Sequence, residues 1–397
     1  MVAFTNQDKW NNFRAVLECA VAIHASTSDP DVIDDRSSLI RASTRASVLE
    51  EQKDLITATL FQQQLSENNI WKNEDPSAYY DVYSQEKLGV GGFARVYKVL
   101  RKADKKQFAL KFCTPSTDED REMMFHEVAL MRMCATQSIC LHVEEAYNDA
   151  QRNILWIFIE LMDCSITNII KGMRVREEYY TENALRWILR QSLKGLHYLH
   201  ARNIVHRDIK SDNILTNKAG DVKLADFGYS AQLTQERSAR SSKVGTLCWM
   251  APELIKGERR YDTKIDIWSY GIFAFELAEG DPPYIREPQS RIMINIITRD
   301  PPQISSRWSQ NFRDFVSLCL TTDPEQRPSA KDLLQHPFLQ GPANKWKEAY
   351  ASMVNTYVID RAEAKARKKA EAKAARRLER QREKEQAKLA ASTRSKK

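Results

Sequence analysis

One run of residues, Val205-His206-Arg207-Asp208-Ile209-Lys210-Ser211-Asp212-Asn213-Ile214-Leu215, carries more chemical information than any other part of the chain. In it the carboxylate of Asp208 is followed by the ammonium of Lys210 two residues later and by the amide of Asn213 five residues later. A carboxylate can accept the proton of a hydroxyl group, an ammonium can neutralise a phosphate, and an amide oxygen can complete a Mg²⁺ shell. This spacing is typical of a loop that performs phosphoryl transfer.

Further motifs follow this run in a fixed order. Thirteen residues beyond Asn213, Asp226-Phe227-Gly228 offers a second carboxylate for a metal after a predicted strand, Val222–Ala225. Met250-Ala251-Pro252-Glu253 and Asp266-Ile267-Trp268-Ser269-Tyr270-Gly271 come next. Each motif alone is also compatible with unrelated polar residues in loops, but that reading does not explain the ordered set.

A glycine-rich segment, Leu88-Gly89-Val90-Gly91-Gly92-Phe93-Ala94-Arg95-Val96, lies upstream. Glycines let a backbone turn lie close over phosphates, although the segment alone is equally consistent with an ordinary hairpin. Fifteen positions after Val96, the apolar strand pattern Phe108-Ala109-Leu110 ends at Lys111. A lysine there needs a counter-charge, which Glu127 on the helical pattern Arg121–Cys134 can supply. The pair can then hold the α- and β-phosphates of a nucleotide.

Together these motifs resemble the eukaryotic protein kinase pattern over about Tyr83–Leu339, roughly two thirds of the chain. The resemblance implies an α+β, bilobal fold, in which a β-rich N-lobe precedes a helical C-lobe and ATP binds between them. The short β-type runs Phe93–Val99, Gln107–Phe112 and Ile154–Leu161, followed by long helical patterns, agree with two lobes of different class.

The resemblance also implies a role for each matching residue. Asp208 would be the catalytic base, with Lys210, Asn213 and Thr246 as the other catalytic residues. Asn213 and Asp226 would bind Mg²⁺, and the cofactors would be ATP and Mg²⁺. The residues expected around the nucleotide are Gly89, Val90, Gly91, Gly92, Phe93, Ala94, Val96, Ala109, Lys111, Glu127, Glu160, Met162, Leu215 and Asp226. The family's gatekeeper position falls on Ile159. Its buried ion pair falls on Glu253 and Arg327.

Finer features are similar to serine/threonine kinases of the sterile-twenty-like group, most of all the PAK family. Lys210 and Gly245-Thr246 are what Ser/Thr kinases carry. Ser242 occupies the site of the activating phosphorylation in PAK-type kinases, so Ser241 and Ser242 are phosphosite candidates, with solvated loop serines as the alternative. The chain departs from the family in Leu247-Cys248, where Pro-Tyr is usual, and shows no Rho-GTPase-binding motif, so GTPase binding is not supported.

Three regions are predicted along the chain: a helical N-terminal extension over 1–82, a kinase domain over 83–340 and a C-terminal extension over 341–397. Helical spacing recurs through Phe13–Val21 and Val48–Leu65, so the first region is either regulatory or a helical extension packed on its neighbour. From about residue 361 the tail consists mostly of Ala, Lys, Arg, Glu and Gln without a heptad seam, and is predicted to be helical or disordered.

The composition excludes several classes. With 42% hydrophobic and 28% charged residues, the chain is a globular protein, and no apolar segment predicts a membrane span. Seven scattered cysteines without metal-ligand spacing predict reduced thiols and a cytoplasmic location. The net positive charge of +7 comes from residues 360–397, which hold 15 Lys and Arg against 6 Asp and Glu. The other residues hold 45 Lys and Arg against 47 Asp and Glu.

Three functions remain open at this point. The first is an active Ser/Thr kinase in intracellular signalling. It would be regulated by loop phosphorylation and would act on serine or threonine residues of proteins. A pseudokinase scaffold is the rival, but such proteins usually lack one of the equivalents of Lys111, Asp208, Asn213 and Asp226, all of which are present here. The third possibility is that the basic tail recruits the protein to an anionic partner such as RNA, a microtubule or an acidic lipid, against a solvated helix as the alternative.

Overall fold

A computed structural model describes residues 70–394, except 83–85, 91–93, 135–136, 229, 233–245 and 258–261. The helices predicted for the first 69 residues, the loop residues Gly91, Gly92 and Phe93, and the serines Ser241 and Ser242 lie outside the described residues. Within the described part of the chain, no helix is both long enough and apolar enough to cross a membrane.

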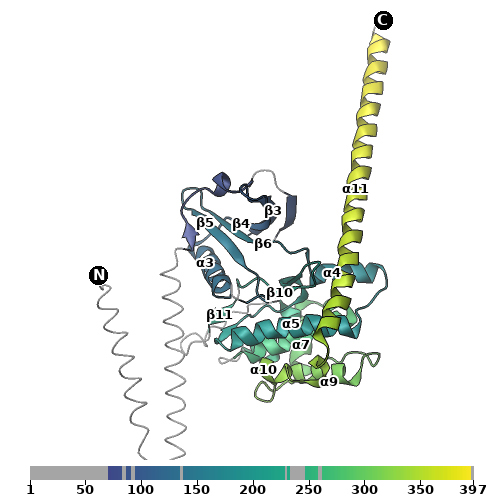
Figure 1. Ribbon diagram of the computed structural model, residues 1–397. Coiled ribbons are helices and arrows are strands. Elements are labelled where there is room, and N and C mark those ends of the chain that lie inside the picture. The colour runs from purple at the N-terminus through teal and green to yellow at the C-terminus, as the bar shows by residue number, and fades with distance from the viewer. Residues whose placement is uncertain are drawn as a thin grey trace, which may run out of the picture. The chain divides into compact units, whose positions relative to one another are not determined.

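The N-terminal part of the described chain, residues 70–160, forms a six-stranded sheet with one long helix, α3, beside it (Figure 1). The strand order is β1-β5-β6-β4-β3-β2; β1 runs parallel to β5, and the other neighbours are antiparallel. The elements are β1 (Trp71–Lys72), a 3₁₀ turn η1 (Pro76–Ala78), β2 (Glu86–Val90), β3 (Ala94–Leu100), β4 (Gln107–Cys113), α3 (Asp118–Met133), β5 (Val143–Asp149) and β6 (Ile154–Glu160).

Strand alternation in β4 decides which side chains face α3. Successive side chains of a strand point to opposite faces of the sheet. Phe108 and Leu110 therefore join a small outer core with Tyr80 and Phe158. Cys113 belongs to the main core, on the same face as α3, and Lys111 is on this face because it lies two residues away.

Helix α3 begins at Thr117, whose side chain accepts the backbone N–H of Asp120 while the Asp120 carboxylate accepts the N–H of Thr117. This capping box satisfies two donors that the first helical turn leaves without partners. The helix buries Met124, Val128 and Met131 at helical spacing. Glu127 lies on the same stripe and is 3% exposed, so its carboxylate needs a positively charged partner within the protein.

The remainder of the described chain, residues 164–394, is mainly helical. Its elements are β7 (Cys164–Ser165), α4 (Ile166–Val175), α5 (Glu182–His200), β8 (Ile204–Val205), η2 (Ser211–Asn213), β9 (Ile214–Thr216), β10 (Val222–Leu224), β11 (Ala231–Gln232), η3 (Leu247–Trp249), α6 (Pro252–Lys256), α7 (Lys264–Glu279), α8 (Gln289–Thr298), α9 (Gln310–Cys319), α10 (Ala330–Leu333), η4 (Pro337–Leu339) and α11 (Ala343–Arg394). Helix α7 packs against α5, α9, η2 and η3, and nearly all of its residues are buried. A helix that is apolar on all sides belongs in the core.

The 52-residue helix α11 is docked on this helical region through its first turns (Figure 1). Trp346, Tyr350, Val354 and Tyr357 are buried at helical spacing, against α4 and α5. Gly172 of α4 makes room for this contact, because a Cβ at that position would overlap the ring of Tyr357. Beyond this docked part, α11 continues as a helix to Arg394.

The predicted α+β class, strands first and helices after, is confirmed. The β-type runs predicted from the sequence correspond to β3, β4 and β6 with ends shifted by one residue. The tail, predicted to be helical or disordered from about residue 361, lies in a helix that begins earlier, at Ala343.

Candidate active site

The loop between β8 and β9 gathers its polar side chains around one carboxylate. Asp208 is 3% exposed. Its Oδ2 accepts hydrogen bonds from Lys210 Nζ at 2.6 Å and from Asn213 Nδ2 at 2.8 Å. Its Oδ1 accepts the hydroxyl of Thr246 at 3.0 Å, and Thr246 Oγ1 in turn accepts Lys210 Nζ at 2.6 Å. The four residues expected to be catalytic thus form one hydrogen-bonded cluster.

Helix α7 holds the backbone of this loop through Asp266. The Asp266 carboxylate accepts the backbone N–H of His206 at 2.7 Å, that of Arg207 at 2.8 Å, and the ring Nε2 of His200 at 2.9 Å. Burial acts to raise the pKa of this carboxyl, but these bonds keep it below its ordinary value. Arg207 has a positive φ of 68°, a strained conformation that persists only where surrounding contacts impose it.

The lysine that ends the β4 pattern meets its predicted partner. Lys111 Nζ lies 2.6 Å and 2.7 Å from the two carboxylate oxygens of Glu127. Burial disfavours the charge on Lys111, but the carboxylates of Glu127 and Asp226 raise its pKa above the ordinary value for lysine. Lys111 therefore carries a full positive charge beside two carboxylates.

Asp226 connects this ion pair to the catalytic loop. It has a positive φ of 64°, and Gly228 follows closely, where a Cβ would lie 3.4 Å from Asp226 Oδ1 and 3.6 Å from Glu127 Oε2. The backbone N–H of Ala225 donates to the carbonyl of Asn213 at 2.9 Å, and the rings of His206 and Phe227 are 5.3 Å apart. Phe227 and the α3 residue Met131 share the main core.

The oxygen atoms of Asn213 and Asp226 fit a Mg²⁺ ion that binds together with phosphates. The amide nitrogen of Asn213 donates to both the carbonyl and the carboxylate of Asp208, which leaves the amide oxygen of Asn213 as an acceptor. Asp226 adds a carboxylate. Among the described residues, no group of three or more His, Cys, Asp or Glu side chains could hold a metal alone. Mg²⁺ commonly takes one or two protein oxygens and completes its shell with phosphates and water.

Of the residues expected around the nucleotide, several lie on β2, β3 and β4. Gly89 pairs with Val96 and Val90 with Arg95 across β2 and β3, with a register shift between Lys87 and Gly89. Val96 also pairs with Lys111. Ala94, which begins β3, pairs with Cys113. Strands β2 and β3, on either side of residues 91–93, are therefore antiparallel neighbours, and β3 pairs with the strand that carries Lys111.

The segment after β6 holds Glu160 by its side chain. Ile159 pairs with Ala109 of β4. The Glu160 carboxylate accepts the backbone N–H of His142 at 2.8 Å and pairs with Lys223 Nζ at 2.6 Å. Met162 and Leu215 are both partly buried against the main core. The cofactor-binding residues expected after the sheet thus lie on β6, on the connection to β7 and on β9.

Farther from the loop, the expected buried ion pair is present. Arg327 Nη1 lies 2.8 Å from Glu253 Oε1 and Nη2 lies 3.2 Å from Oε2, with both side chains almost completely buried. Carbonyl groups of Thr321, Thr322 and Lys264 accept the other donors of the guanidinium. This bidentate geometry fixes the segment after Thr246 to the end of the helical region.

Sequence reasoning missed the roles of Asp266 and Glu276. From the sequence, Glu276 and Asp281 are equally compatible with contacts to basic residues before the target hydroxyl and with a carboxylate pair in solvent, and the Asp266 motif has no assigned role. Neither reading fits Glu276, which is 5% exposed and accepts bonds from Ser211 and from Trp249 Nε1. Burial raises the pKa of Glu276 to about 7. Acidic residues within the otherwise apolar run 265–278 were the available signal for both roles.

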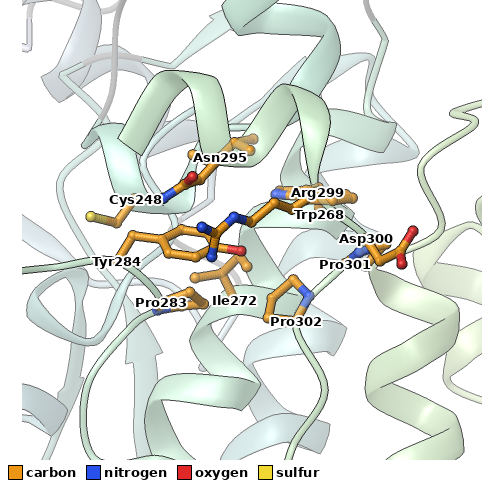
Figure 2. Close-up of a pocket in the computed structure, with 11 residues that line it drawn as sticks. Cys248, Trp268, Ile272, Pro283, Tyr284, Asn295, Arg299, Asp300, Pro301 and Pro302 are labelled. Atoms are coloured by element: carbon orange, nitrogen blue, oxygen red, sulfur yellow. The ribbon is translucent and has the colours of Figure 1, made fainter. Parts of the chain in front are cut away.

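Two of the hollows among the described residues lie in the helical region. One is lined by Asp208, Thr246 and neighbouring residues, so the cluster around the carboxylate is at its edge. The other lies between α7 and α8 and has Cys248 and Trp268 in its wall (Figure 2). In the second hollow the guanidinium of Arg299 lies over the ring of Tyr284, 5.9 Å from its centroid. Burial raises the pKa of the Cys248 thiol to about 11, so Cys248 remains a neutral thiol.

The protein kinase domain model matches residues 82–339, and the chain therefore belongs to the protein kinase family. It is 38% identical over 300 residues to "Serine/threonine-protein kinase pakB" of Dictyostelium discoideum. This match covers 74% of this chain and 34% of the relative. It is 40% identical over 269 residues to dst1 and 43% identical over 255 residues to pakG, both serine/threonine-protein kinases of the same organism. These matches cover 67% and 64% of this chain, but 35% and 21% of the relatives. The chain thus spans about a third of these relatives or less.

Proposed function

We propose that this chain is an ATP-dependent serine/threonine protein kinase, which transfers the γ-phosphate of Mg-ATP to serine or threonine residues of proteins. The observation that carries this proposal is the cluster in which Lys210, Asn213 and Thr246 all donate to the Asp208 carboxylate. Three donors on one buried carboxylate fix its direction. The PAK-type relatives support the serine/threonine class.

In this proposal Asp208 receives the proton of the substrate hydroxyl. A carboxylate offers about four acceptor positions. Lys210, Asn213 and Thr246 occupy three of them, and Thr246 is the donor to Oδ1. The remaining position on Oδ1 can accept the substrate hydroxyl, while Lys210 is close enough to reach a transferred phosphoryl group as well as Asp208.

Lys111 binds the α- and β-phosphates of ATP, and Glu127 keeps its ammonium directed and charged. Asn213 and Asp226 are the residues that would hold Mg²⁺, which supplies neutralisation of charge on the phosphates. We assign the adenine and ribose to the surface made by Val96, Ala109, Met162 and Leu215, together with backbone groups of Glu160 and the glycine-rich segment.

Regulation is part of the proposal and rests on sequence. Ser242 is assigned as the activating phosphosite, with Ser241 as the neighbouring candidate, and Arg207 as the side chain that receives the phosphate. We further assign the protein to intracellular signalling in the cytoplasm. The six described cysteines are all unpaired thiols, as expected in a reducing compartment.

The test is phosphate transfer from labelled Mg-ATP to a basic protein substrate by the purified full chain, followed by identification of the phosphorylated amino acids. Asp208→Asn is expected to lower kcat by about 10²–10⁴-fold, the usual contribution of a positioned base. Asp314→Asn, a surface carboxylate on α9, is the matched control. Phosphotyrosine as the main product would reject the serine/threonine class. A wild type that binds ATP without transfer would show a pseudokinase.

A second activity is proposed for the basic residues beyond 361, namely binding of an anionic partner. The observation that favours it is the continuation of α11 as a helix to Arg394, well past Tyr357, the last of its residues that the structure describes as buried. The fragment 341–397 contains docked residues, so the test compares the full chain with a full chain in which Arg376, Arg377 and Arg380 are changed to Gln. RNA, microtubules and anionic vesicles are the probes. Binding that falls steeply with salt and is lost in the variant supports the proposal; equal binding by both chains rejects it.

A further inference from the structure

A short segment outside the kinase-family match completes the sheet. Residues 70–81 precede residue 82, where the family match begins. Within them, β1 pairs with β5 at the edge of the sheet, with Trp71 beside Ala146 and Lys72 beside Tyr147. The segment then turns through η1 and returns along β3, where Asp81 N–H donates to the carbonyl of Leu100.

The two residues of β1 face opposite sides of the sheet, as strand geometry requires. Trp71 lies on the α3 side, where the small side chain of Ala146 leaves room for the indole. Its ring centroid is 4.7 Å from that of Phe125 in α3. Trp71 and Phe125 both pack against the core that contains Val128 and Met131. Phe125 is two residues before Glu127, the partner of Lys111.

The other side of β1 anchors the strand through Glu145. The Glu145 carboxylate accepts Lys72 Nζ at 2.6 Å, Tyr80 Oη at 2.7 Å and Tyr147 Oη at 2.9 Å. Burial acts to raise the pKa of Glu145, but these donors keep it below the ordinary value. Both ends of residues 70–81 are thereby tied to one carboxylate of β5, so the position of Trp71 does not depend on its own contact alone.

A further pair of contacts fixes the turn between them. Arg152 Nη1 lies 2.9 Å from Asp75 Oδ2, and Lys102 Nζ donates to the carbonyl of Ser77 at 2.6 Å. The segment is therefore fixed to β5, to the turn before β6 and to the turn after β3. Helix α3 receives the Trp71 side chain near its middle. Its first turns are held separately, because Arg121 donates to Asn148 and Asn153.

We propose that residues 70–81 form a clamp on α3, and that Trp71 is a positioning residue for phosphoryl transfer. Its ring contact with Phe125 favours the position of α3 in which Glu127 reaches Lys111. Removal of the contact shifts the helix toward positions in which the ion pair is broken, so the fraction of competent enzyme falls. This inference rests on the proposed kinase activity, but its structural part does not.

The experiment uses the full chain with the variants Trp71→Ala, Trp71→Phe, Phe125→Ala and the double variant Trp71→Ala/Phe125→Ala. Tyr79→Ala is the matched control, because Tyr79 is an exposed aromatic residue of the same segment that stacks on Tyr147 instead of α3. The measurements are kcat and the KM for ATP, and hydrogen exchange of the α3 amides around Glu127 in the protein without nucleotide.

We expect Trp71→Ala to lower kcat by about three- to tenfold, as the loss of an aromatic pair allows. Exchange of the α3 amides should become faster by a similar factor. Trp71→Phe should retain most of the activity, and Tyr79→Ala should match the wild type. Since both single variants remove the same contact, the double variant should be no worse than the poorer single variant.

Three results overturn the clamp: wild-type kcat in Trp71→Ala, effects of the single variants that multiply in the double variant, or a loss of thermal stability without change in kcat or in α3 exchange. Wild-type protein that transfers no phosphate overturns the proposed function instead. In that case α3 exchange still decides whether the clamp exists, because it is measured without catalysis.

Discussion

The carboxylate oxygen Oδ2 of Asp266 accepts the backbone N–H of His206 at 2.7 Å, across 60 positions of the chain. A buried residue of the central helix α7 thereby supports the backbone of the loop that carries Asp208. The same carboxylate also receives the N–H of Arg207, in its positive-φ conformation. The geometry of the proposed catalytic base depends on the placement of α7 as much as on the loop itself.

Asp266→Asn should reduce both stability and activity. An asparagine offers one oxygen, so one of the two backbone N–H groups would face an NH₂ group and lose its acceptor. We expect the free energy of unfolding to fall by about 1–3 kcal/mol, the usual loss for an unsatisfied buried donor. The kcat should fall at least tenfold because the loop is displaced. Urea unfolding and steady-state kinetics measure the two effects, with the exposed neighbour Asp262→Asn as control. Unchanged kcat in folded Asp266→Asn protein would contradict the support role.

Glu276 should make stability fall as the pH rises. Its pKa is about 7 in the folded protein, whereas an ordinary glutamate titrates near 4.5. Between these values the unfolded chain has released the proton and the folded protein retains it, so the folded state binds more protons. The contribution is fully present below about pH 4.5 and is lost as the pH rises through about 7; it amounts to at most about 3 kcal/mol.

The measurement for Glu276 is urea unfolding of wild type and Glu276→Gln at several pH values from 5 to 8. The glutamine keeps the shape of the side chain without its titration. Wild-type stability minus that of the variant should decrease across this range. A difference that is constant with pH would show that Glu276 is ionised throughout, held by Ser211 and Trp249 as donors.

The effect of Gly172→Ala on stability should change sign when the Tyr357 ring is removed. Alanine at position 172 would collide with the Tyr357 ring, so Gly172→Ala should destabilise the wild type by about 1–3 kcal/mol and loosen α11. In a Tyr357→Ala background the collision is absent. There the same change should stabilise the protein by up to about 1 kcal/mol, because alanine is the better helix former in α4.

Thermal unfolding and limited proteolysis of α11 measure the Gly172 effect in both backgrounds. If Gly172→Ala destabilises both backgrounds equally, the contact between α4 and α11 is not the reason for glycine at this position.

Loss of the buried pair Glu253–Arg327 should be costly and insensitive to salt. Glu253→Gln leaves a fully buried guanidinium without its counter-charge and should lower the free energy of unfolding by about 3–5 kcal/mol. Buried charges are screened weakly, so the loss should be nearly the same in 0.1 M and 1 M NaCl. Asp104→Asn, which breaks the surface pair with Arg101, is the control and should change stability little. A Glu253→Gln loss that disappears in high salt would contradict the buried position.

The family and the chemistry of the loop were predictable from residue identities alone. Asp208, Lys210 and Asn213 lie within five positions of one another, so one loop carries all three, although their orientation depends on the support from Asp266. Lys111 was recognisable because an ammonium at the end of an apolar strand requires a carboxylate, and Glu127 was a candidate on a nearby helical pattern. The sequence predicted only that Glu127 can supply this charge; the structure shows the two side chains in contact.

Several contacts between residues distant in the chain depend on the tertiary fold and could not be predicted. Whether Glu276 meets solvent or Ser211, whether Asp266 supports the loop, and whether Trp71 touches Phe125 all depend on how helices and strands pack. Local residue preferences do not specify packing, because many side chains of similar polarity can occupy the same helix face. For the same reason the sequence separated residues 341–397 from the kinase body, whereas Trp346, Tyr350, Val354 and Tyr357 bury the first turns of α11 in it.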